Sequence, residues 1–128
     1  MKKIISKSFY FEAAHNLATT NNKVNKNIHG HSYFVEVFII DETNEIDKNG
    51  LILDFSIFKK KLNLIKKDID HKFLNEIYGL ENPTLERIGI YIFNRLKETD
   101  LNLYKILVKR KSCGSPPTRR SVKSFQGP

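Results

Sequence analysis

The chain has 128 residues, of which 40% are hydrophobic and 28% charged, as in ordinary globular domains. It carries 22 Lys and Arg against 14 Asp and Glu, and no apolar run is long enough to cross a bilayer. The N-terminus lacks the apolar stretch of a secretory signal, and Cys113 is the only cysteine, so we expect a cytoplasmic protein with no membrane association and no intrachain disulfide.

The residue pattern predicts two strands in the first forty residues. Residues 3–11 form the first. Residues 31–40 form the second, and the alternation is clearest there, because every second side chain is apolar and shares one face. Those side chains are Tyr33, Val35, Val37 and Ile39. The polar, asparagine-rich residues 18–27 lie between the two segments and are expected to form a loop.

A turn and a helix follow. Asp47-Lys48-Asn49-Gly50 predicts a turn, because an Asn-Gly pair tolerates positive φ, and residues 51–53 are then expected to resume a strand. Asp54 can cap a helix, since its carboxylate can accept a backbone N–H of the first turn. The helix has an apolar stripe with spacings of three and four residues. The stripe consists of Phe55, Phe58, Leu62, Ile65 and Ile69.

A second helix opens at residues 82–86. Its apolar stripe again repeats every three or four residues. The stripe consists of Leu85, Ile88, Ile92 and Leu96. Residues 104–108 then predict a final strand. Strands followed by two helices and a last strand are typical of an α+β fold, here an antiparallel sheet covered on one face.

The C-terminal residues differ in composition from the rest. Residues 101–128 contain seven Lys or Arg and no acidic residue, whereas residues 1–100 hold 15 basic and 14 acidic residues. Residues 111–128 are rich in Ser, Pro and Arg without apolar periodicity. We therefore expect a folded domain over residues 1–111 and a flexible basic tail over residues 112–128. A near-neutral body argues against nucleic acid as the partner.

Three histidines are candidates for a metal site. His29 and His31 are two residues apart at a strand start, so both side chains share one face. His15 follows the preceding strand, and a hairpin-like return would bring it beside the pair. Three imidazoles without a fourth protein ligand are the arrangement of a catalytic zinc. Ordinary hydrogen-bonded histidines would show the same spacing, so the pattern alone leaves both interpretations open.

Two further pairs of residues could carry chemistry. Asp70 precedes His71 after the first helix, where a carboxylate can orient an imidazole as general acid or base. A histidine at a helix C-terminus also interacts favourably with the helix dipole. Thr84 and Glu86 lie at the start of the second helix, where both are favourable first-turn residues without any further role.

Five ordered segments together resemble the 6-pyruvoyl-tetrahydropterin synthase and 6-carboxy-tetrahydropterin synthase family, over about residues 3–108. Residues 11–17 and 28–33 resemble its zinc-ligand motifs, and residues 53–55 resemble its entry into the first helix. Residues 69–75 resemble its catalytic Leu-Asp-His-x-x-Leu-Asn block, and residues 80–86 resemble a stretch that helps hold the pterin.

The resemblance implies the tunnelling fold: an antiparallel four-stranded sheet with two helices packed on one face, joined edge to edge into trimers or hexamers. It also implies a Zn²⁺ cofactor and the substrate 7,8-dihydroneopterin triphosphate. The resemblance implies metal ligands at His15, His29 and His31. It implies catalytic roles for Asp70 and His71, and pterin contacts for Thr84 and Glu86.

The chain departs from the family pattern at two positions. The family's catalytic cysteine lies four residues before the His-x-His pair, where this chain has Asn25, whose amide is no base. The family's last strand carries a pterin-binding Glu, whereas here Arg110 would repel the donor edge of a pterin. We therefore expect a 6-carboxy-tetrahydropterin synthase-like protein. A 6-pyruvoyl-tetrahydropterin synthase or aldolase-like variant on the same substrate, and a zinc-containing pterin-binding protein without turnover, are the alternatives.

Overall fold

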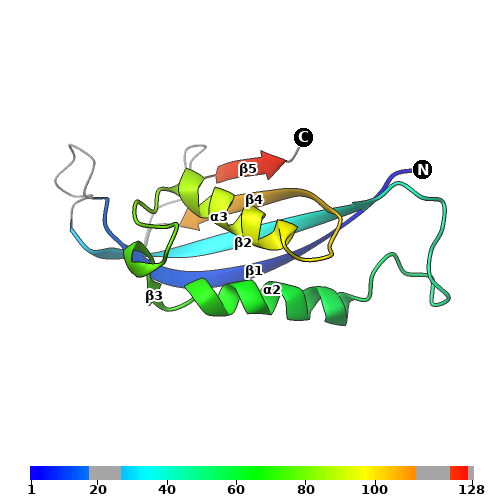
Figure 1. Ribbon diagram of the computed structural model, residues 1–128, viewed down its shortest axis with the longest axis horizontal. Helices are drawn as coiled ribbons and strands as arrows, with labels where there is room; N and C mark the ends of the chain where they lie inside the picture. The colour runs from blue at the N-terminus through cyan, green and yellow to red at the C-terminus, as the bar shows by residue number, and fades with distance from the viewer. Residues whose placement is uncertain (18–26, 112–121, 127–128) are drawn as a thin grey trace.

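A computed structural model describes residues 1–17, 27–111 and 122–126, which form one twisted sheet covered by two helices (Figure 1). The sheet order is β3-β1-β2-β4-β5, and every neighbouring pair is antiparallel except β3 with β1. The strands are β1 (Lys3–His15), β2 (His29–Asp41), β3 (Lys72–Phe73), β4 (Leu103–Lys111) and β5 (Val122–Gln126). The helices are α2 (Phe55–Ile69), the 3-10 turn η1 (Leu74–Glu76) and α3 (Leu85–Lys97). Within the described ranges, no helix has the length and apolarity needed to cross a membrane.

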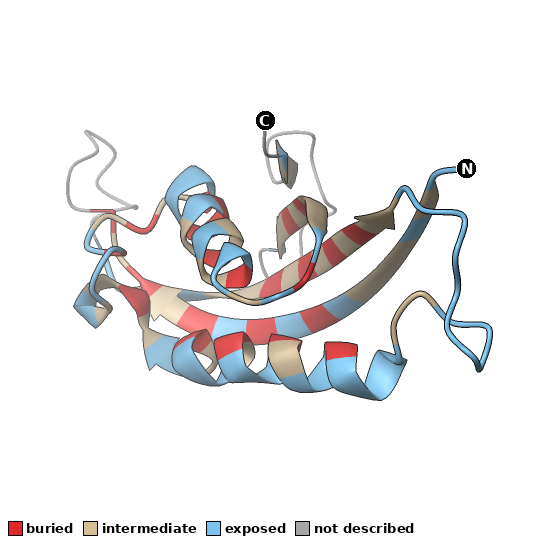
Figure 2. Cartoon of the chain, turned by 45° about the vertical axis from the view of Figure 1, so that its right-hand side comes forward, coloured by how far each residue is buried: buried red, intermediate tan, exposed pale blue. Residues whose placement is uncertain are grey.

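The long hairpin of β1 and β2 is the centre of the fold. Its register pairs Lys3 with Asp41 at one end and His15 with His29 at the other. Burial alternates along both strands, so their odd-numbered side chains face the helices, as the pattern of residues 31–40 predicts (Figure 2). The even-numbered side chains form an open face, on which Tyr10 is 63% exposed.

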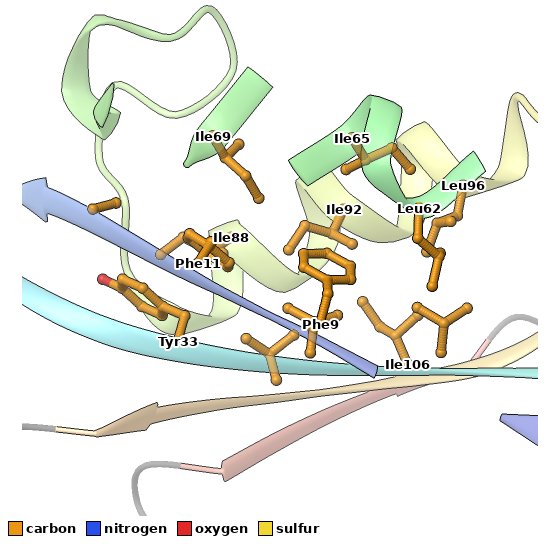
Figure 3. Close-up of a cluster of buried hydrophobic side chains, with 14 of the residues drawn as sticks. Phe9, Phe11, Tyr33, Leu62, Ile65, Ile69, Ile88, Ile92, Leu96 and Ile106 are labelled. Carbon is orange, nitrogen blue, oxygen red and sulfur yellow. The ribbon is translucent and has the colours of Figure 1, made fainter. Parts of the chain in front are cut away.

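The core lies between this sheet face and the two helices, which contribute their predicted stripes (Figure 3). Four of the five stripe residues of α2 and all four of α3 are buried. Phe55 is the exception and is 47% exposed. It opens the helix, where its ring stacks on Phe58 at 6.3 Å and lies 5.5 Å from Lys7 Nζ.

Both helix starts match the sequence prediction. Asp54 Oδ1 accepts the Ser56 N–H at 2.8 Å, and Thr84 Oγ1 accepts the Arg87 N–H at 3.2 Å. Each cap satisfies a backbone donor that the helix itself leaves unpaired. The predicted turn at residues 47–50 is also present, with Gly50 at φ 81°.

The strand expected at residues 51–53 is absent. Asp47 Oδ1 accepts the backbone N–H groups of both Asn49 and Leu51, which closes a compact turn. The chain then bends directly into Asp54 without pairing to the sheet. Three residues are too few to compete with this local hydrogen bonding.

The C-terminal segment also differs from expectation, because residues 122–126 form β5 on the outer edge of β4. The sheet therefore has five strands of mixed direction, rather than four antiparallel ones. Phe125 packs on the core at Gly89, where a side chain would overlap the ring. Residues 112–121 lie outside the described residues, and the domain boundary at residue 111 stays a prediction.

Candidate metal centre

The hairpin register brings the three predicted histidines together at one end of the sheet. His15 is the last residue of β1 and pairs with His29, the first residue of β2, while His31 pairs with Ala13. The ring centroids of His15 and His29 are 4.6 Å apart, and each is 4.8 Å from that of His31. One nitrogen from each ring lies within 4.8 Å of the other two.

Backbone carbonyls fix the tautomers of two of these rings. His15 Nδ1 lies 3.2 Å from the Pro83 oxygen, and His29 Nδ1 lies 2.7 Å from the Asn27 oxygen. A carbonyl only accepts, so each Nδ1 carries the proton and donates it. The bare nitrogens of the two neutral rings are then the Nε2 atoms, which face each other at 3.0 Å. Two lone pairs repel at this distance unless a cation lies between them.

His31 supplies the third nitrogen. Both of its ring nitrogens are buried and have no hydrogen-bond partner among the described residues. Leaving such a group unsatisfied costs about 1–3 kcal/mol, which a metal bond would offset. Zinc–nitrogen bonds of about 2.0–2.1 Å separate tetrahedral ligand atoms by about 3.3 Å, close to the 3.0 Å between the Nε2 atoms of His15 and His29. The donor set therefore fits a zinc ion held by three imidazoles.

Burial favours the neutral form of two of the three rings. Burial, and to a smaller extent the neighbouring His29, lowers the pKa of His15 to about 4. Burial likewise lowers the pKa of His31 to about 4, followed in effect by the charge of Arg110. Neutral imidazole is the form that binds metal, so at pH 7 both rings are ready to bind an ion without losing a proton.

Tyr33 contacts the histidine cluster through its hydroxyl group. The sequence predicts it only as a core residue. Its side chain is fully buried, its oxygen lies 3.2 Å from His15 Nδ1, and its ring stacks on Phe11 at 4.6 Å. Burial raises the pKa of Tyr33, so the hydroxyl stays protonated. Tyr33 lies two residues after His31 and therefore on the same strand face, so the sequence could have indicated its contact with the cluster. No sequence pattern indicates the contact of the Pro83 carbonyl with His15.

A second positioning residue is Asn75. Its Oδ1 accepts the Asn16 N–H at 2.9 Å, and its Nδ2 donates to the Asn16 carbonyl at 3.0 Å and the Glu81 carbonyl at 3.2 Å. These bonds tie the residue after His15 to the segment that leads into Pro83. Asn75 thereby fixes both sides of the contact that sets the His15 tautomer.

Asp70 and His71 do not join the histidine cluster. Asp70 Oδ1 accepts the Glu12 N–H at 2.9 Å, and the His71 N–H donates to the Glu12 oxygen at 2.6 Å. His71 has φ 57°, and its side chain is 79% exposed. Its Nε2 lies 3.7 Å from Asp70 Oδ2, beyond hydrogen-bond distance. His71 does line a hollow of about 590 Å³ together with His31.

Thr84 and Glu86 have local partners at the start of α3. Thr84 is the helix cap, and Glu86 Oε1 lies 3.0 Å from Lys123 Nζ on β5. The hydrogen bond from Lys123 lowers the pKa of Glu86, and the charge of Arg110 adds to this effect. Asn25, the position of the expected cysteine, lies outside the described residues.

A hairpin that gathers three imidazoles beneath two helices defines a small α+β protein with a candidate metal centre. Residues 4–114 match the family model described as 6-pyruvoyl tetrahydropterin synthase. The chain belongs to this family, which confirms the resemblance of its motifs.

Relatives within the family differ in reaction. A 6-carboxy-5,6,7,8-tetrahydropterin synthase from Synechocystis sp. is 40% identical over 98 residues, covering 74% of this chain and 75% of that protein. A dihydroneopterin monophosphate aldolase from Pyrococcus furiosus is 35% identical over 71 residues, covering 56% and 57%. The structure of Caenorhabditis elegans 6-pyruvoyl tetrahydropterin synthase aligns with TM-score 0.80 at 25% identity, over 100% of this chain and 97% of that one.

Proposed function

We propose that this chain is a zinc-dependent 6-carboxy-tetrahydropterin synthase that acts on 7,8-dihydroneopterin triphosphate. The observation that carries the proposal is the convergence of three imidazoles, of which His31 has no hydrogen-bond partner among the described residues. The 40% identity to the Synechocystis synthase supports the choice of reaction.

The metal ligands would be His15, His29 and His31. Zinc bound there would hold hydroxyl groups of the substrate side chain and acidify a neighbouring C–H bond. Tyr33 and the Pro83 carbonyl hold the His15 ring so that Nε2 faces the ion. The orientation of the His15 ring is set before any ligand binds, because Tyr33 and Pro83 are both buried in the folded chain.

His71 is the group best placed to accept the proton. His71 lines the same hollow as His31, its side chain is exposed, and an imidazole can serve as a general base. Asp70 acts as a positioning residue in this proposal. Its carboxylate accepts the Glu12 N–H and thereby anchors the backbone that carries His71 in a left-handed conformation.

Glu86 would hold the pterin ring. A carboxylate can accept two hydrogen bonds from the amidine-like edge of a pterin. Glu86 Oε1 is paired with Lys123, so ligand binding would exchange one partner for another. Thr84 flanks this position and would contact the ring through its hydroxyl.

Two observations favour other outcomes on the same substrate class. The Pyrococcus relative is named an aldolase, which favours cleavage of the side chain as a second candidate. Asn25 stands where the family has its cysteine, which favours pterin binding without turnover.

The deciding experiment incubates zinc-loaded protein with dihydroneopterin triphosphate and resolves the products by mass. The 6-carboxy product supports the proposal. The 6-pyruvoyl product identifies the alternative synthase, and a 6-hydroxymethyl product identifies the aldolase. Bound but unchanged substrate identifies a binding protein. Metal-free protein and the His31→Ala variant serve as controls, and turnover in both as fast as in the zinc-loaded unmodified protein would exclude a metal-dependent reaction.

A further inference from the structure

The C-terminal strand β5 brings a cation to the start of α3. Lys123 pairs with Val108 in the register of β5 with β4, and Val108 is buried against the helices. Because directly opposed residues of neighbouring strands point to the same face of a sheet, Lys123 also points toward the helices. Its Nζ lies 3.0 Å from Glu86 Oε1 in the first turn of α3. The last strand therefore contacts the carboxylate that is proposed to hold the pterin ring.

Phe125 fixes the position of β5 against this helix. It pairs with Ile106, so its ring lies on the same side of the sheet as Lys123, and it packs against the core beside Gly89 of α3. A side chain at Gly89 would overlap the Phe125 ring, so glycine is needed for this contact. The ring holds β5 against the same helix whose first turn carries Glu86. Lys123 is thereby kept within reach of the Glu86 carboxylate.

The ion pair is weak enough to open. Glu86 lies where the helix dipole favours a negative charge, and its side chain is 55% exposed. The side chain of Lys123 is 40% exposed, so water can solvate its ammonium group. Solvent screening leaves ion pairs of this exposure only a small net stabilisation. Another donor can therefore displace Lys123 from the carboxylate.

We propose that Lys123 makes an autoinhibitory contact, in which its ammonium group occupies the Glu86 carboxylate and must leave before a pterin binds there. This inference rests on the proposed function, in which Glu86 accepts two hydrogen bonds from the amidine-like edge of the ring. Such an edge uses both oxygens of a carboxylate, and Lys123 occupies one of them. The C-terminal strand thus lowers the pterin affinity of the folded chain, and a change that moves β5 away from α3 raises it.

The test measures the affinity of zinc-loaded, full-length protein for neopterin by pterin fluorescence. Neopterin carries no phosphate, so loss of a lysine has no direct charge effect on it. In Lys123→Met, which removes the ammonium group from a side chain of similar length, we expect the affinity to rise about two- to fivefold, the range of an exposed ion pair. The same change should have no effect in a Glu86→Gln background, because Lys123 then has no carboxylate to occupy.

Ionic strength gives a second readout. Salt screens the ion pair of Lys123 with Glu86 and acts little on a neutral ligand. The affinity of the unmodified protein should therefore rise with salt toward that of Lys123→Met, whose own affinity should stay constant. Phe125→Ala should raise the affinity as well, since β5 loses its contact with the core. Lys105→Met is the matched control and should leave the affinity unchanged, because Lys105 lies over the Phe38 ring at 4.8 Å on the open face of the sheet.

An ion pair with a purely structural role gives a different result. Lys123→Met would then lower the melting temperature without raising the affinity for neopterin, which overturns the proposal. A rise that persists in the Glu86→Gln background, or that Lys105→Met shares, also overturns it. Failure of the proposed function is recognised separately, because neither the unmodified protein nor Lys123→Met then binds neopterin, or Glu86→Gln binds it as tightly as the unmodified protein. Either of these results excludes the pterin contact and, with it, the inhibition at Glu86.

Discussion

The buried histidines predict that the metal-free protein loses stability in mild acid. Burial holds the pKa of His15 at about 4, against about 6.5 in the unfolded chain. Between these two pKa values, His15 is therefore protonated in the unfolded state and neutral in the folded state. Stability is fully present above pH 6.5 and falls as the pH drops from 6.5 toward 4.

The magnitude follows from the two pKa values of His15. Lowering the pH from 7 to 5 protonates His15 in the unfolded chain but scarcely in the folded one, which costs about 2 kcal/mol. Burial gives His31 a similarly low pKa of about 4, which adds a cost of the same sign. The pKa values of Asp54 and Glu81 are lowered, so these carboxylates stay ionised over this range.

The assay is urea unfolding of chelator-treated protein at pH 7, 6 and 5, with His15→Gln as the comparison. We expect the unmodified protein to lose about 2 kcal/mol or somewhat more between pH 7 and 5. His15→Gln should be less stable at pH 7 but flatter with pH. Unchanged stability between pH 7 and 5, or the same slope in both proteins, would refute the argument that burial keeps His15 neutral.

Further predictions concern the metal, the missing base, the C-terminal strand and assembly. Elemental analysis should find about one zinc per chain, most of it lost in His31→Ala, and full retention would contradict a three-histidine site. Asn25→Cys should raise synthase turnover at least about tenfold, a cautious part of the range for general-base catalysis; robust turnover without it would point to His71. Gly89→Ala should destabilise the protein by up to about 2 kcal/mol, since the methyl group displaces the Phe125 ring while alanine favours the helix. In a Phe125→Ala background the same change should stabilise, and equal effects in both backgrounds would show that the ring does not pack there. Light scattering should show a trimer or hexamer, because the sheet has open edges, and a monomer at all concentrations would count against it.

Periodicity predicted the parts of the fold that bury a continuous stripe. The stripes of α2 and α3 and the inward face of β2 follow from side-chain spacing alone, and Asp54 and Thr84 cap their helices as expected. Such local rules hold here because the same residues that form each element also form the core.

What could not be predicted depends on contacts between distant segments. Residues 122–126 are too few and too polar to indicate a strand, and β5 forms where Gly89 leaves room for Phe125. Nothing in the sequence shows that the Pro83 carbonyl meets His15 across 68 positions of chain. Asp70 and His71 adjoin in sequence, yet hydrogen bonds to Glu12 direct the carboxylate of Asp70 and the backbone of His71.

The hairpin register has a consequence for metal affinity. A slip of β2 by one residue against β1 would turn His29 and His31 to the open face, together with Tyr33 and the apolar residues that follow. Such a slip would empty the core, so the folded chain is held in the one register that gathers the imidazoles. The site therefore needs no ordering of its own when an ion arrives, and the entropy that a flexible set of ligands would lose on binding is already lost in folding.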